Sequence, residues 1–360
     1  MFYSKRGRAL RIAVVAVILL VVAVVLTIGI FNSLPYGNQP QIEANAHNVI
    51  LLIGDGMGFE HIRAASYFGD VSMDEFEYSG SVTTRSLSHS VTDSAAAATA
   101  MATGKKTFNA MLSYSGTEKL TNLGEIVKEN NKKLGVVVTK SVTDATPAAF
   151  TAHSVLRTAQ AAIALEQIRE ADCDVLFGEG RQYFDTHSAR INREDRAYIN
   201  SLEALKANTK PKAYAIFDKV EPDSEHNLAV LTGIALDMLT CEQGFFLMVE
   251  GSKIDSHSHN NKMDKMLAEF WAFNDAVLVA LEYAKAHTNT TVIVTADHET
   301  GGLTLPTELS AMAINNDCFT TTGHTNANVG YFAYGPGASE IPELIDNTDL
   351  FYIINQLLFA

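Results

Sequence analysis

Four short runs of apolar residues recur along the chain, and each has the length of one buried β-strand. The runs are NVILLIG at 48–54, LGVVVT at 134–139, FFLMVE at 245–250 and TVIVTA at 291–296. Apolar runs without alternation are typical of strands covered on both faces. Amphipathic helical patterns lie between them, at 156–170 and in the segment that begins at Met263. This alternation predicts an α/β fold, with a mostly parallel central sheet and helices on both faces.

The length of the chain limits its domain organisation. With 360 residues, 47% of them hydrophobic, it is long enough for one large domain or two ordinary ones. Residues 181–227 are richer in charge and poorer in pattern, and we interpret them as a surface excursion rather than a second domain. We therefore expect one folded domain over residues 47–360.

The N-terminal part of the chain has the pattern of a membrane anchor. Residues 12–31, IAVVAVILLVVAVVLTIGIF, carry no charge and are long enough to cross a bilayer as a helix. A basic segment, residues 1–11, precedes this transmembrane signal-anchor and places the N-terminus in the cytoplasm. Residues 32–46 are polar and are interpreted as a linker. We expect a single-pass protein of the cytoplasmic membrane, with its domain extracytoplasmic, in the periplasm or at the cell surface.

A cleaved signal peptide is the alternative interpretation of this segment, and the domain would then be secreted. Signal peptides usually have a shorter apolar core that is closely followed by small residues. Here the only A-x-A candidate, residues 44–46, lies well past the apolar run. The sequence therefore favours an uncleaved anchor.

The charge of the chain excludes one class of partner. The net charge is −14, and the four basic residues of the N-terminal segment are followed by no acidic residue before Glu43. Without those four charges the remainder carries −18. Nucleic-acid binding depends on positive charge facing phosphates, so we expect no binding of nucleic acid.

The three cysteines have no zinc-ribbon or CxxC spacing, and the sequence does not decide whether any two of them pair.

Each strand candidate ends in a carboxylate or leads into one. The first leads to Asp55, the third ends at Glu250, and the fourth leads to Asp297 and His298. The second leads into TDATPAAFTAH, which contains Asp144 and Thr146. Open α/β sheets bind ligands beyond the carboxyl ends of their strands, so we expect these side chains to converge.

The stretch VEGSKIDSHSHNN combines a carboxylate and an imidazole at helical spacing. Asp255 and His259 are four positions apart, which places both side chains on one face of a helical turn. Such a pair suits zinc, which takes oxygen and nitrogen ligands. His257 would point elsewhere and is interpreted as a surface histidine or as one that supports the ligands without binding the metal. His324, in TTTGHTN, follows a glycine that lets the loop approach another group closely.

The segment SVTDSAAAATAMATG, residues 90–104, predicts a helix that begins near Asp93 and Ser94. Aspartate and serine are favoured at helix N-termini, and alanine has the highest helix propensity. Taken alone, these two residues are most simply explained as a helix cap.

Six motifs in this chain resemble those of the alkaline phosphatase family. They are IGDGMG, VTDSAAAATAMATG, TDATPAAFTAH with Arg157 just beyond it, MVEGSKID followed by a histidine, VTADHETGG and GHT. They occur in the family's order and span nearly all of the chain after residue 47. The resemblance implies an alkaline-phosphatase-like catalytic domain over residues 47–360. It also implies broad hydrolysis of phosphate monoesters, with inorganic phosphate as the product.

The resemblance further implies a site with two zinc ions and one magnesium ion. One zinc ion would be held by Asp255, His259 and His324. The second zinc ion would be held by Asp297 and His298, with Asp55 and the Ser94 oxygen. The third ion, typically Mg²⁺, would share Asp55 and add Thr146 and Glu250, while Asp144 reaches it through water.

The catalytic roles that the resemblance implies fall on Ser94 and Arg157. Ser94 would attack phosphorus in line and form a phosphoserine, because a cation and a helix N-terminus both stabilise its alkoxide. Arg157 would bind two non-bridging phosphate oxygens with its planar guanidinium. Asp93, which also belongs to the substrate-binding residues, would orient Arg157. Metal ions would make a cationic pocket within an acidic protein.

Two departures from the family pattern qualify these expectations. Ser256 stands where relatives carry a larger residue, and with Asp144 it leaves the identity of the third metal open. Only residues 299–323 separate His298 from His324, too few for the large surface insertion of some relatives. The resemblance also implies that the chain can form a homodimer. Such a dimer would lack the part of the usual contact that this insertion provides.

Two alternative functions remain. A related phosphodiesterase or nucleotide pyrophosphatase has a similar two-zinc core, but tends to use threonine as nucleophile and to lack the arginine and the third site. A non-catalytic metal-binding surface module would require an intact site to be idle. Ser94, Arg157, Thr146 and Glu250 favour the monoesterase over both.

Overall fold

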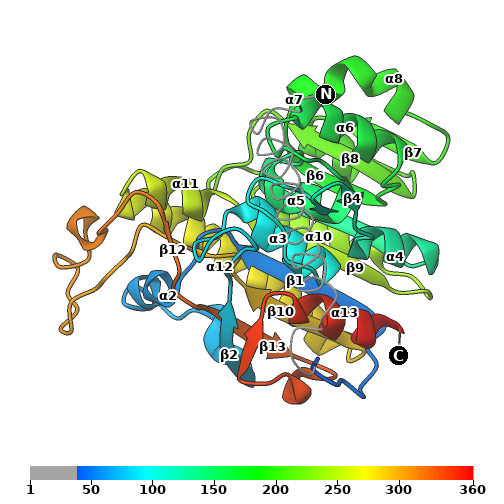
Figure 1. The fold of residues 1–360 in the computed structure, drawn as a ribbon. Helices are drawn as coiled ribbons and strands as arrows, with labels where there is room; N and C mark the ends of the chain where they lie inside the picture. The colour runs from blue at the N-terminus through cyan, green and yellow to red at the C-terminus, as the bar shows by residue number, and fades with distance from the viewer. Residues whose placement is uncertain (1–38, 360) are drawn as a thin grey trace, which may run out of the picture. The chain divides into compact units, whose positions relative to one another are not determined.

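The computed structural model describes residues 39–359, and the folded domain is the compact unit Pro40–Ala360 (Figure 1). The expected transmembrane segment, residues 12–31, and the basic segment before it lie outside the described residues. Among the helices that are described, none has the length and apolar character needed to span a bilayer.

The main sheet has ten strands in the spatial order β14-β2-β13-β10-β1-β9-β5-β6-β8-β7. Their bounds are β1 Asn48–Gly54, β2 Tyr78–Thr83, β5 Lys133–Ser141, β6 Val175–Glu179, β7 Arg196–Ile199, β8 Lys212–Phe217, β9 Phe245–Gly251, β10 Thr290–Thr295, β13 Val329–Tyr334 and β14 Leu344–Asp346. All neighbouring pairs are parallel except β10 with β13 and β13 with β2. The predicted α/β fold with a mostly parallel sheet is confirmed.

Helices form a layer on each side of the sheet (Figure 1). The longer ones are α2 Phe59–Ser66, α3 Ser94–Thr103, α4 Leu123–Glu129, α5 Ala145–Thr151, α6 Gln160–Arg169, α10 Leu228–Leu239, α11 Lys253–His259, α12 Met263–Ala286 and α13 Asp349–Phe359. α10 and α12 pack together over β5, β9 and β10, whereas α3, α4, α5 and α13 form the second layer. Every residue of β1, β9 and β10 is buried, because both faces of these strands are covered.

The segment 181–227 is not a surface excursion, and this expectation is wrong. It contains three short α-helices, α7 Arg181–Phe184, α8 Ser188–Ile191 and α9 Leu202–Lys206, and the 3-10 helix Asp185–His187, together with the strands β7 and β8. These two strands extend the main sheet beyond β6. Their side chains enter the core: Tyr214 is fully buried, and the guanidinium of Arg196 lies over its ring, 4.4 Å from the centroid. Short strands with polar neighbours gave too weak a pattern to be recognised.

The helix expected at 156–170 begins later, at Gln160. The residues before it form a bridge at Ser154 and a turn at residues 156–159, and the segment around Leu112 holds them there. Leu112 and Ser154 form an antiparallel bridge, and the Arg157 amide donates to the Ala110 carbonyl at 2.9 Å. These bonds fix the backbone at Arg157 outside the helix.

The chain just before β1 already belongs to the domain. Ile42 and Ala46 are buried, the Ile42 amide donates to Gln356 Oε1, and the Ala46 amide donates to the Leu357 carbonyl. Residues 42–46 of the expected linker therefore pack along α13.

The three cysteines, Cys173, Cys241 and Cys318, are all free.

Candidate metal centre and active site

The carboxyl ends of four neighbouring parallel strands meet at one edge of the sheet, which confirms the expected convergence. β10, β1, β9 and β5 are adjacent and parallel. Asp55 directly follows β1, Glu250 is the penultimate residue of β9, and Asp297 lies two residues beyond β10. In the register of the sheet, Ile53 pairs with Glu250 on one side and with Thr295 on the other. The carboxylates therefore leave the sheet at nearly the same level.

A glycine turn after β1 lets other segments approach Asp55 closely. Gly56 has a φ of 76°, and a Cβ at this position would lie 2.9 Å from the Asp255 Cα. Its amide donates to Asp297 Oδ1 at 3.1 Å. A side chain here would strain the backbone and separate these segments.

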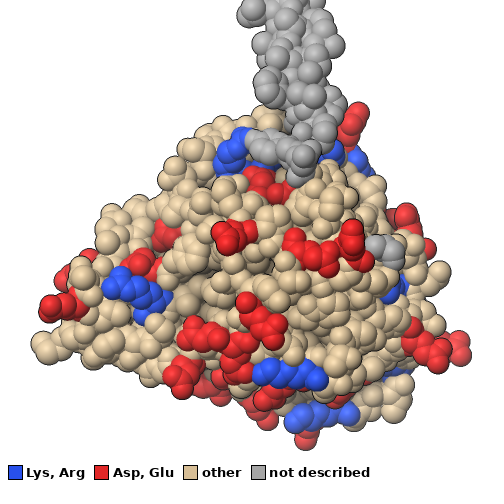
Figure 2. All heavy atoms as spheres, turned by 90° about the horizontal axis from the view of Figure 1, so that it is seen from below, with Lys and Arg blue, Asp and Glu red and all other residues tan. Residues whose placement is uncertain are grey.

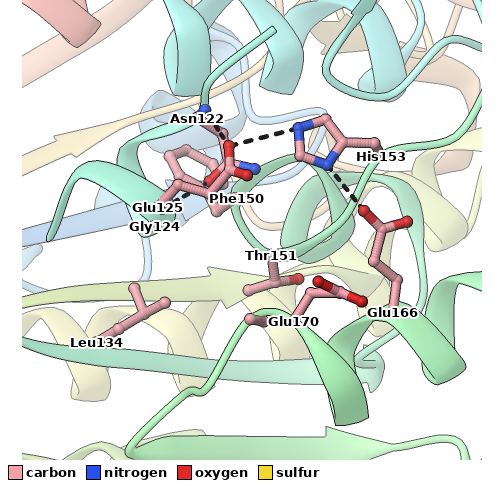
Figure 3. A pocket seen from close by; sticks show the side chains of 10 residues that line it. Asn122, Gly124, Glu125, Leu134, Phe150, Thr151, His153, Glu166 and Glu170 are labelled. Atoms are coloured by element: carbon pink, nitrogen blue, oxygen red, sulfur yellow. Dashed lines mark hydrogen bonds and ion pairs between the residues drawn. The ribbon is translucent and has the colours of Figure 1, made fainter. Parts of the chain in front are cut away.

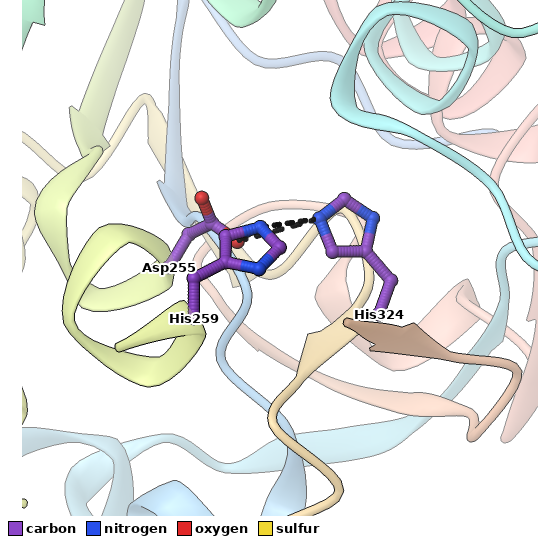
Figure 4. A group of neighbouring side chains, drawn as sticks. All are labelled: Asp255, His259 and His324. Atoms are coloured by element: carbon purple, nitrogen blue, oxygen red, sulfur yellow. Dashed lines mark hydrogen bonds and ion pairs between the residues drawn. The ribbon is translucent and has the colours of Figure 1, made fainter. Parts of the chain in front are cut away.

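Asp255, His259 and His324 form the first group of potential metal ligands (Figure 4). α11 presents Asp255 and His259 one turn apart, with Asp255 Oδ1 3.1 Å from His259 Nε2. His324 comes from the short strand β12 His324–Thr325, which pairs with β11 Glu299–Thr300. Its Nε2 lies 3.4 Å from the same carboxylate oxygen and 3.1 Å from His259 Nε2.

Backbone carbonyls fix the orientation of both imidazoles in this group. His259 Nδ1 donates to the Thr322 carbonyl at 2.5 Å, and His324 Nδ1 donates to the Thr92 carbonyl at 2.9 Å. Each neutral ring then carries its lone pair on Nε2. Two such nitrogens 3.1 Å apart, next to a carboxylate oxygen, suit a shared cation.

Asp55, Asp297 and His298 form the second group of potential ligands. His298 Nε2 lies 3.2 Å from Asp297 Oδ2 and 3.6 Å from Asp55 Oδ1. The other Asp297 oxygen accepts from the Gly56 and His298 amides. Asp297 and His298 are fully buried.

Thr300 connects the two groups, and the sequence analysis did not identify it. Its hydroxyl donates to Asp255 Oδ1 at 2.7 Å, and it lies 3.2 Å from His298 Nδ1. Because the hydroxyl proton is used by Asp255, the contact with His298 has Nδ1–H as its donor. The lone pair of His298 therefore lies on Nε2, which faces Asp55 and Asp297. The only signal in the sequence was the position of Thr300 within VTADHETGG.

Buried carboxylate oxygens without a hydrogen-bond donor show that these residues fit a cation. Asp55 Oδ1, Asp297 Oδ2 and Glu250 Oε2 are buried and accept no hydrogen bond from the described residues. Burial raises the pKa of Asp55 well above its usual range, and the Asp297 carboxylate raises it further. Burial likewise raises the pKa of Asp297 to about 6 and that of Glu250 to about 8. Such a cluster of carboxylates needs compensating positive charge to stay ionised at neutral pH.

The residues expected at the third ion lie beside these groups but do not complete another triplet. Glu250 is buried, and Asp144 caps α5, with its Oδ1 accepting from the Ala145 amide at 2.8 Å. Thr146 is buried in the first turn of the same helix. Within residues 39–359, three histidine or acidic ligand atoms come within 4.8 Å of one another only in the two groups described above.

Ser94 is the first residue of α3 and faces the second group. Its hydroxyl oxygen lies 3.2 Å from His298 Nε2, and the residue is 3% exposed. The N-cap of this helix is Asp93, whose Oδ1 accepts from the Ala96 amide. All ten residues of α3 are buried, and their small side chains let the helix pack closely against α5. Capping of the helix by Asp93 leaves the Ser94 hydroxyl directed at the ligands.

Arg157 lies between two carboxylates, as the expected role of Asp93 requires. Its Nη1 is 3.2 Å from Asp93 Oδ2, and its Nη2 is 3.2 Å from Asp144 Oδ1. Asp93 Oδ2 also accepts from the Ala110 amide, which in turn belongs to the segment that holds the Arg157 backbone. The guanidinium is thus fixed at the same edge of the sheet as Ser94.

Two further charged residues were not recognised from the sequence. The first lies at this edge of the sheet, and the second lies beside a cavity lined by Leu134, near the opposite end of β5. Lys140, near the end of β5, lies 3.9 Å from Asp255 Oδ2 and 4.0 Å from Asp144 Oδ2. His153, at the end of the TDATPAAFTAH motif, has partners in Glu166 and Glu125, 2.9 and 3.4 Å away (Figure 3). Burial lowers the pKa of His153, but the two carboxylates outweigh it and raise the pKa to about 9.

The His153 cluster secures the segment that leads to Arg157. His153 Nε2 also lies 3.0 Å from the Leu120 carbonyl. Because Glu125 belongs to α4 and Glu166 to α6, the ring joins the end of α5 to both helices. Figure 3 shows His153, Glu125 and Glu166 among the side chains that line one cavity. The cavity has a volume of about 20 Å³, enough for one water molecule. Arg157 is only four residues further along the chain.

Comparison with solved structures places the fold among known enzymes. The alkaline phosphatase of the Antarctic bacterium TAB5 has a similar structure, with a TM-score of 0.79 and 33% sequence identity. The match covers 88% of this chain and 99% of that chain. A variant of the TAB5 enzyme, which matches equally well, has Mg bound in its M3 site.

Comparison with families and curated proteins gives the same result. The model of the alkaline phosphatase family matches residues 46–214 and 214–317. Alkaline phosphatase 4 of Bacillus subtilis is 29% identical over 99% of this chain and 98% of its own length. Streptomycin-6-phosphate phosphatase of Streptomyces griseus is 31% identical over 89% of this chain and 91% of its own length. The chain therefore belongs to the alkaline phosphatase family and is an enzyme that hydrolyses phosphoric monoesters.

Proposed function

We propose that this enzyme hydrolyses phosphate monoesters of broad range through a phosphoserine at Ser94, at a site that holds two zinc ions and one Mg²⁺. The observation that carries the proposal is the contact between the Ser94 hydroxyl and His298 Nε2, at 3.2 Å. A serine on the first turn of a helix, directed at a group of buried ligands, has the surroundings of an activated nucleophile.

The two ligand groups support the assignment of the zinc ions. Asp255, His259 and His324 offer one oxygen and two nitrogens, and three protein ligands are typical of catalytic zinc sites. Asp55, Asp297 and His298 offer the second set, beside Ser94. Bound zinc ions would act as Lewis acids that stabilise the serine alkoxide and the leaving oxygen and lower the pKa of a bound water.

The residues of the chain then have separate tasks. The Ser94 hydroxyl gives up its proton to solvent, and its oxygen forms a bond to phosphorus while the bond between phosphorus and the alcohol oxygen breaks. The alcohol leaves with a proton from solvent. Water then cleaves the phosphoserine and restores the Ser94 hydroxyl, with inorganic phosphate as product. Arg157 orients the phosphoryl group by two hydrogen bonds to non-bridging oxygens. Asp93 and Asp144 hold the guanidinium in place for this contact.

The acidic surface supports a role for bound cations. On the face shown in Figure 2, acidic side chains gather at several places, while basic ones are fewer. An anionic substrate therefore needs a local source of positive charge, which Arg157 alone supplies only in part. For the third ion we assign Asp55, Thr146 and Glu250, with Asp144 acting through water. Glu250 Oε2 accepts no hydrogen bond among the described residues, which supports this assignment.

The test compares two substrate classes on the full-length, zinc- and magnesium-loaded protein. We expect rapid release of alcohol from an aryl phosphate monoester and slow release from the matching bis-aryl phosphate diester. A preference for the diester would favour a phosphodiesterase, and inactivity on both would favour a metal-binding module. The relative named streptomycin-6-phosphate phosphatase suggests streptomycin 6-phosphate as a further monoester to test.

We also propose that residues 12–31 anchor the enzyme in the cytoplasmic membrane, with the domain outside. The uncharged apolar run after a basic segment supports this arrangement. Intact cells should hydrolyse a membrane-impermeant phosphate monoester, and the activity should remain with the membranes after washing at high salt. Activity found only after lysis would contradict it, and activity in the medium would indicate cleavage. Sedimentation of the detergent-solubilised protein would test for a homodimer.

A further inference from the structure

Lys140 is a cation that lies beside the carboxylate cluster. It is the penultimate residue of β5 and lies at the edge of the sheet where the ligand groups meet. Its Nζ is 3.9 Å from Asp255 Oδ2 and 4.0 Å from Asp144 Oδ2. Burial lowers the pKa of Lys140, but Asp55, Asp144, Asp255 and Glu250 together raise it above its usual range. Two carboxylates, those of Asp255 and Asp144, therefore face this one ammonium group within 4.0 Å, and the charges of Asp55 and Glu250 act on it from further away.

The ammonium group is not committed to any one of these carboxylates. Within the described part of the chain, Lys140 Nζ has ion-pair contacts but donates no hydrogen bond that is 3.5 Å or shorter. Lys128 and Lys253, by contrast, donate to Asp174 at 2.7 Å and to Glu179 at 2.9 Å. Lys140 thus occupies the position of a shared counter-ion, which a second cation can displace without the loss of a short hydrogen bond.

The carboxylates around Lys140 overlap with those assigned to the third ion. Asp55 and Glu250 are proposed ligands of that ion, and Asp144 reaches it through water. Asp144 Oδ2 lies 4.0 Å from Lys140 Nζ, and the negative charges of Asp55 and Glu250 also raise the pKa of Lys140. A divalent cation and an ammonium group that share the same acceptors repel each other, and this repulsion weakens the binding of the ion. Asp255 and its two histidines have short contacts of their own and are less dependent on Lys140.

We propose that Lys140 is a built-in competitor of the third cation, so that Mg²⁺ binds weakly and exchangeably while the two zinc ions are retained. The inference rests on the proposed three-ion site and concerns only the affinity of its third position. It identifies a residue that sets the occupancy of this position and that belongs to none of the sequence motifs.

Asp144 contacts both Lys140 and the arginine that is proposed to bind the substrate phosphate. Its Oδ1 faces Arg157 and its Oδ2 faces Lys140. Asp144 thus connects the ammonium group of Lys140 with the phosphate-binding guanidinium of Arg157, so a change of charge at position 140 also acts on Arg157. Activity would then report on several effects at once, and the direct binding of Mg²⁺ is the cleaner measurement.

The experiment titrates Mg²⁺ into the full-length, zinc-loaded protein by isothermal calorimetry and compares Lys140→Met with the wild type. Met keeps most of the side-chain volume and removes the charge, so we expect the dissociation constant for Mg²⁺ to fall by about tenfold or more. Lys140→Arg keeps the charge and should stay within about threefold of the wild type. Zinc content, measured by mass spectrometry of the metals, should be unchanged in both variants.

Lys128→Met is the matched control. Lys128 has 23% of its side chain exposed, against 25% for Lys140, and it also pairs with a buried carboxylate. Its partner Asp174 accepts from the Leu134 amide, at the opposite end of β5. The substitution changes the net charge equally and should leave Mg²⁺ binding unchanged.

An unchanged or weaker affinity for Mg²⁺ in Lys140→Met, with zinc retained, would overturn the proposal. Tightening in Lys140→Arg equal to that in Lys140→Met would also overturn it. If Lys140→Met does not fold, dialysis of the wild type tests the proposal instead. Mg²⁺ should be lost under conditions that leave zinc in place, and tight retention of Mg²⁺ would contradict the inference. Hydrolysis of the monoester by zinc-loaded wild type is measured separately, so that failure of the proposed function is recognised independently.

Discussion

The Ser94 hydroxyl and His298 Nε2 lie 3.2 Å apart, although the two residues are 204 positions apart in the sequence. Ser94 begins α3, and His298 follows β10. Because His298 Nδ1–H donates to the Thr300 hydroxyl, the lone pair of the ring is on Nε2. This atom faces the serine and the carboxylates of Asp55 and Asp297. The nucleophile and its ligand group are therefore brought together by the sheet and one buried helix.

Replacing Ser94 by Ala should remove catalysis and leave the metal site largely intact. The hydroxyl offers one oxygen to a group that keeps three other ligand residues. We expect kcat for an aryl phosphate monoester to fall on the order of 10⁴-fold or more, as for other nucleophile deletions. Zinc content should stay close to that of the wild type. Ser88→Ala, in the loop before α3, is the control and should retain full activity.

Loss of the Arg157 side chain should act on phosphate binding. Hydrogen bonds to charged groups are worth about 1.5–3 kcal/mol, so Arg157→Ala should raise the inhibition constant for inorganic phosphate by roughly 10- to 100-fold. Arg181→Ala is a close control, because Arg181 also lies between two aspartates and has a similar exposed fraction, 29% against 27%. Unchanged phosphate inhibition in Arg157→Ala would show that this arginine is not a phosphate ligand.

Thr300→Val should weaken zinc binding although Thr300 is not among the proposed ligands. Its hydroxyl donates to Asp255 and orients His298, and loss of such supporting contacts typically costs about 10- to 100-fold in metal affinity. Competition with a chromophoric chelator measures the affinity. Thr300→Ser keeps the hydroxyl and should restore wild-type binding. Equal affinities in all three proteins would mean that the Thr300 bridge has no influence on the ligands.

The His153 cluster predicts a pH dependence of stability. The pKa of His153 is about 9 in the folded protein, against 6.5 for the free side chain, so folding favours the protonated ring. Its contribution is complete below about pH 6.5 and is lost as the pH rises through about 9. Because a tenfold change in proton affinity is worth about 1.4 kcal/mol, the loss is about 3 kcal/mol at most.

Urea unfolding at pH 7 and pH 10 measures this effect. The free energy of unfolding should decrease more steeply with pH in the wild type than in His153→Gln, which cannot be protonated. His187→Gln, in the short helix Asp185–His187 outside the cluster, should behave like the wild type. Parallel curves for all three proteins would show that Glu125 and Glu166 do not stabilise a protonated His153.

Much of the site could be predicted because parallel strands and helical turns place residues by rule. Asp55, Glu250 and Asp297 share one edge because their strands are neighbours, and Asp255 and His259 share one face of α11 because they are four residues apart. Ser94 was ambiguous alone, since capping and catalysis use the same residue types. In the structure Asp93 caps the helix and Ser94 faces the ligands.

Other features depended on tertiary neighbours that no local pattern reveals. Lys140 looks like an ordinary charged residue after an apolar run, and only the packing of β5 beside β9 brings it among carboxylates. Thr300 connects the ligand groups because β11 pairs with β12. β7 and β8 were missed because they are short and because Arg196, which is charged, is buried over Tyr214.

Trapping the covalent intermediate tests directly whether Ser94 is the nucleophile that forms a phosphoserine. Full-length, zinc-loaded protein is mixed with an aryl phosphate monoester, quenched in acid, digested and examined by mass spectrometry. We expect phosphate on Ser94, none after removal of the metals with a chelator, and none in Ser94→Ala. Rapid monoester hydrolysis with phosphate on a different residue, or without any phosphorylated residue, would contradict it.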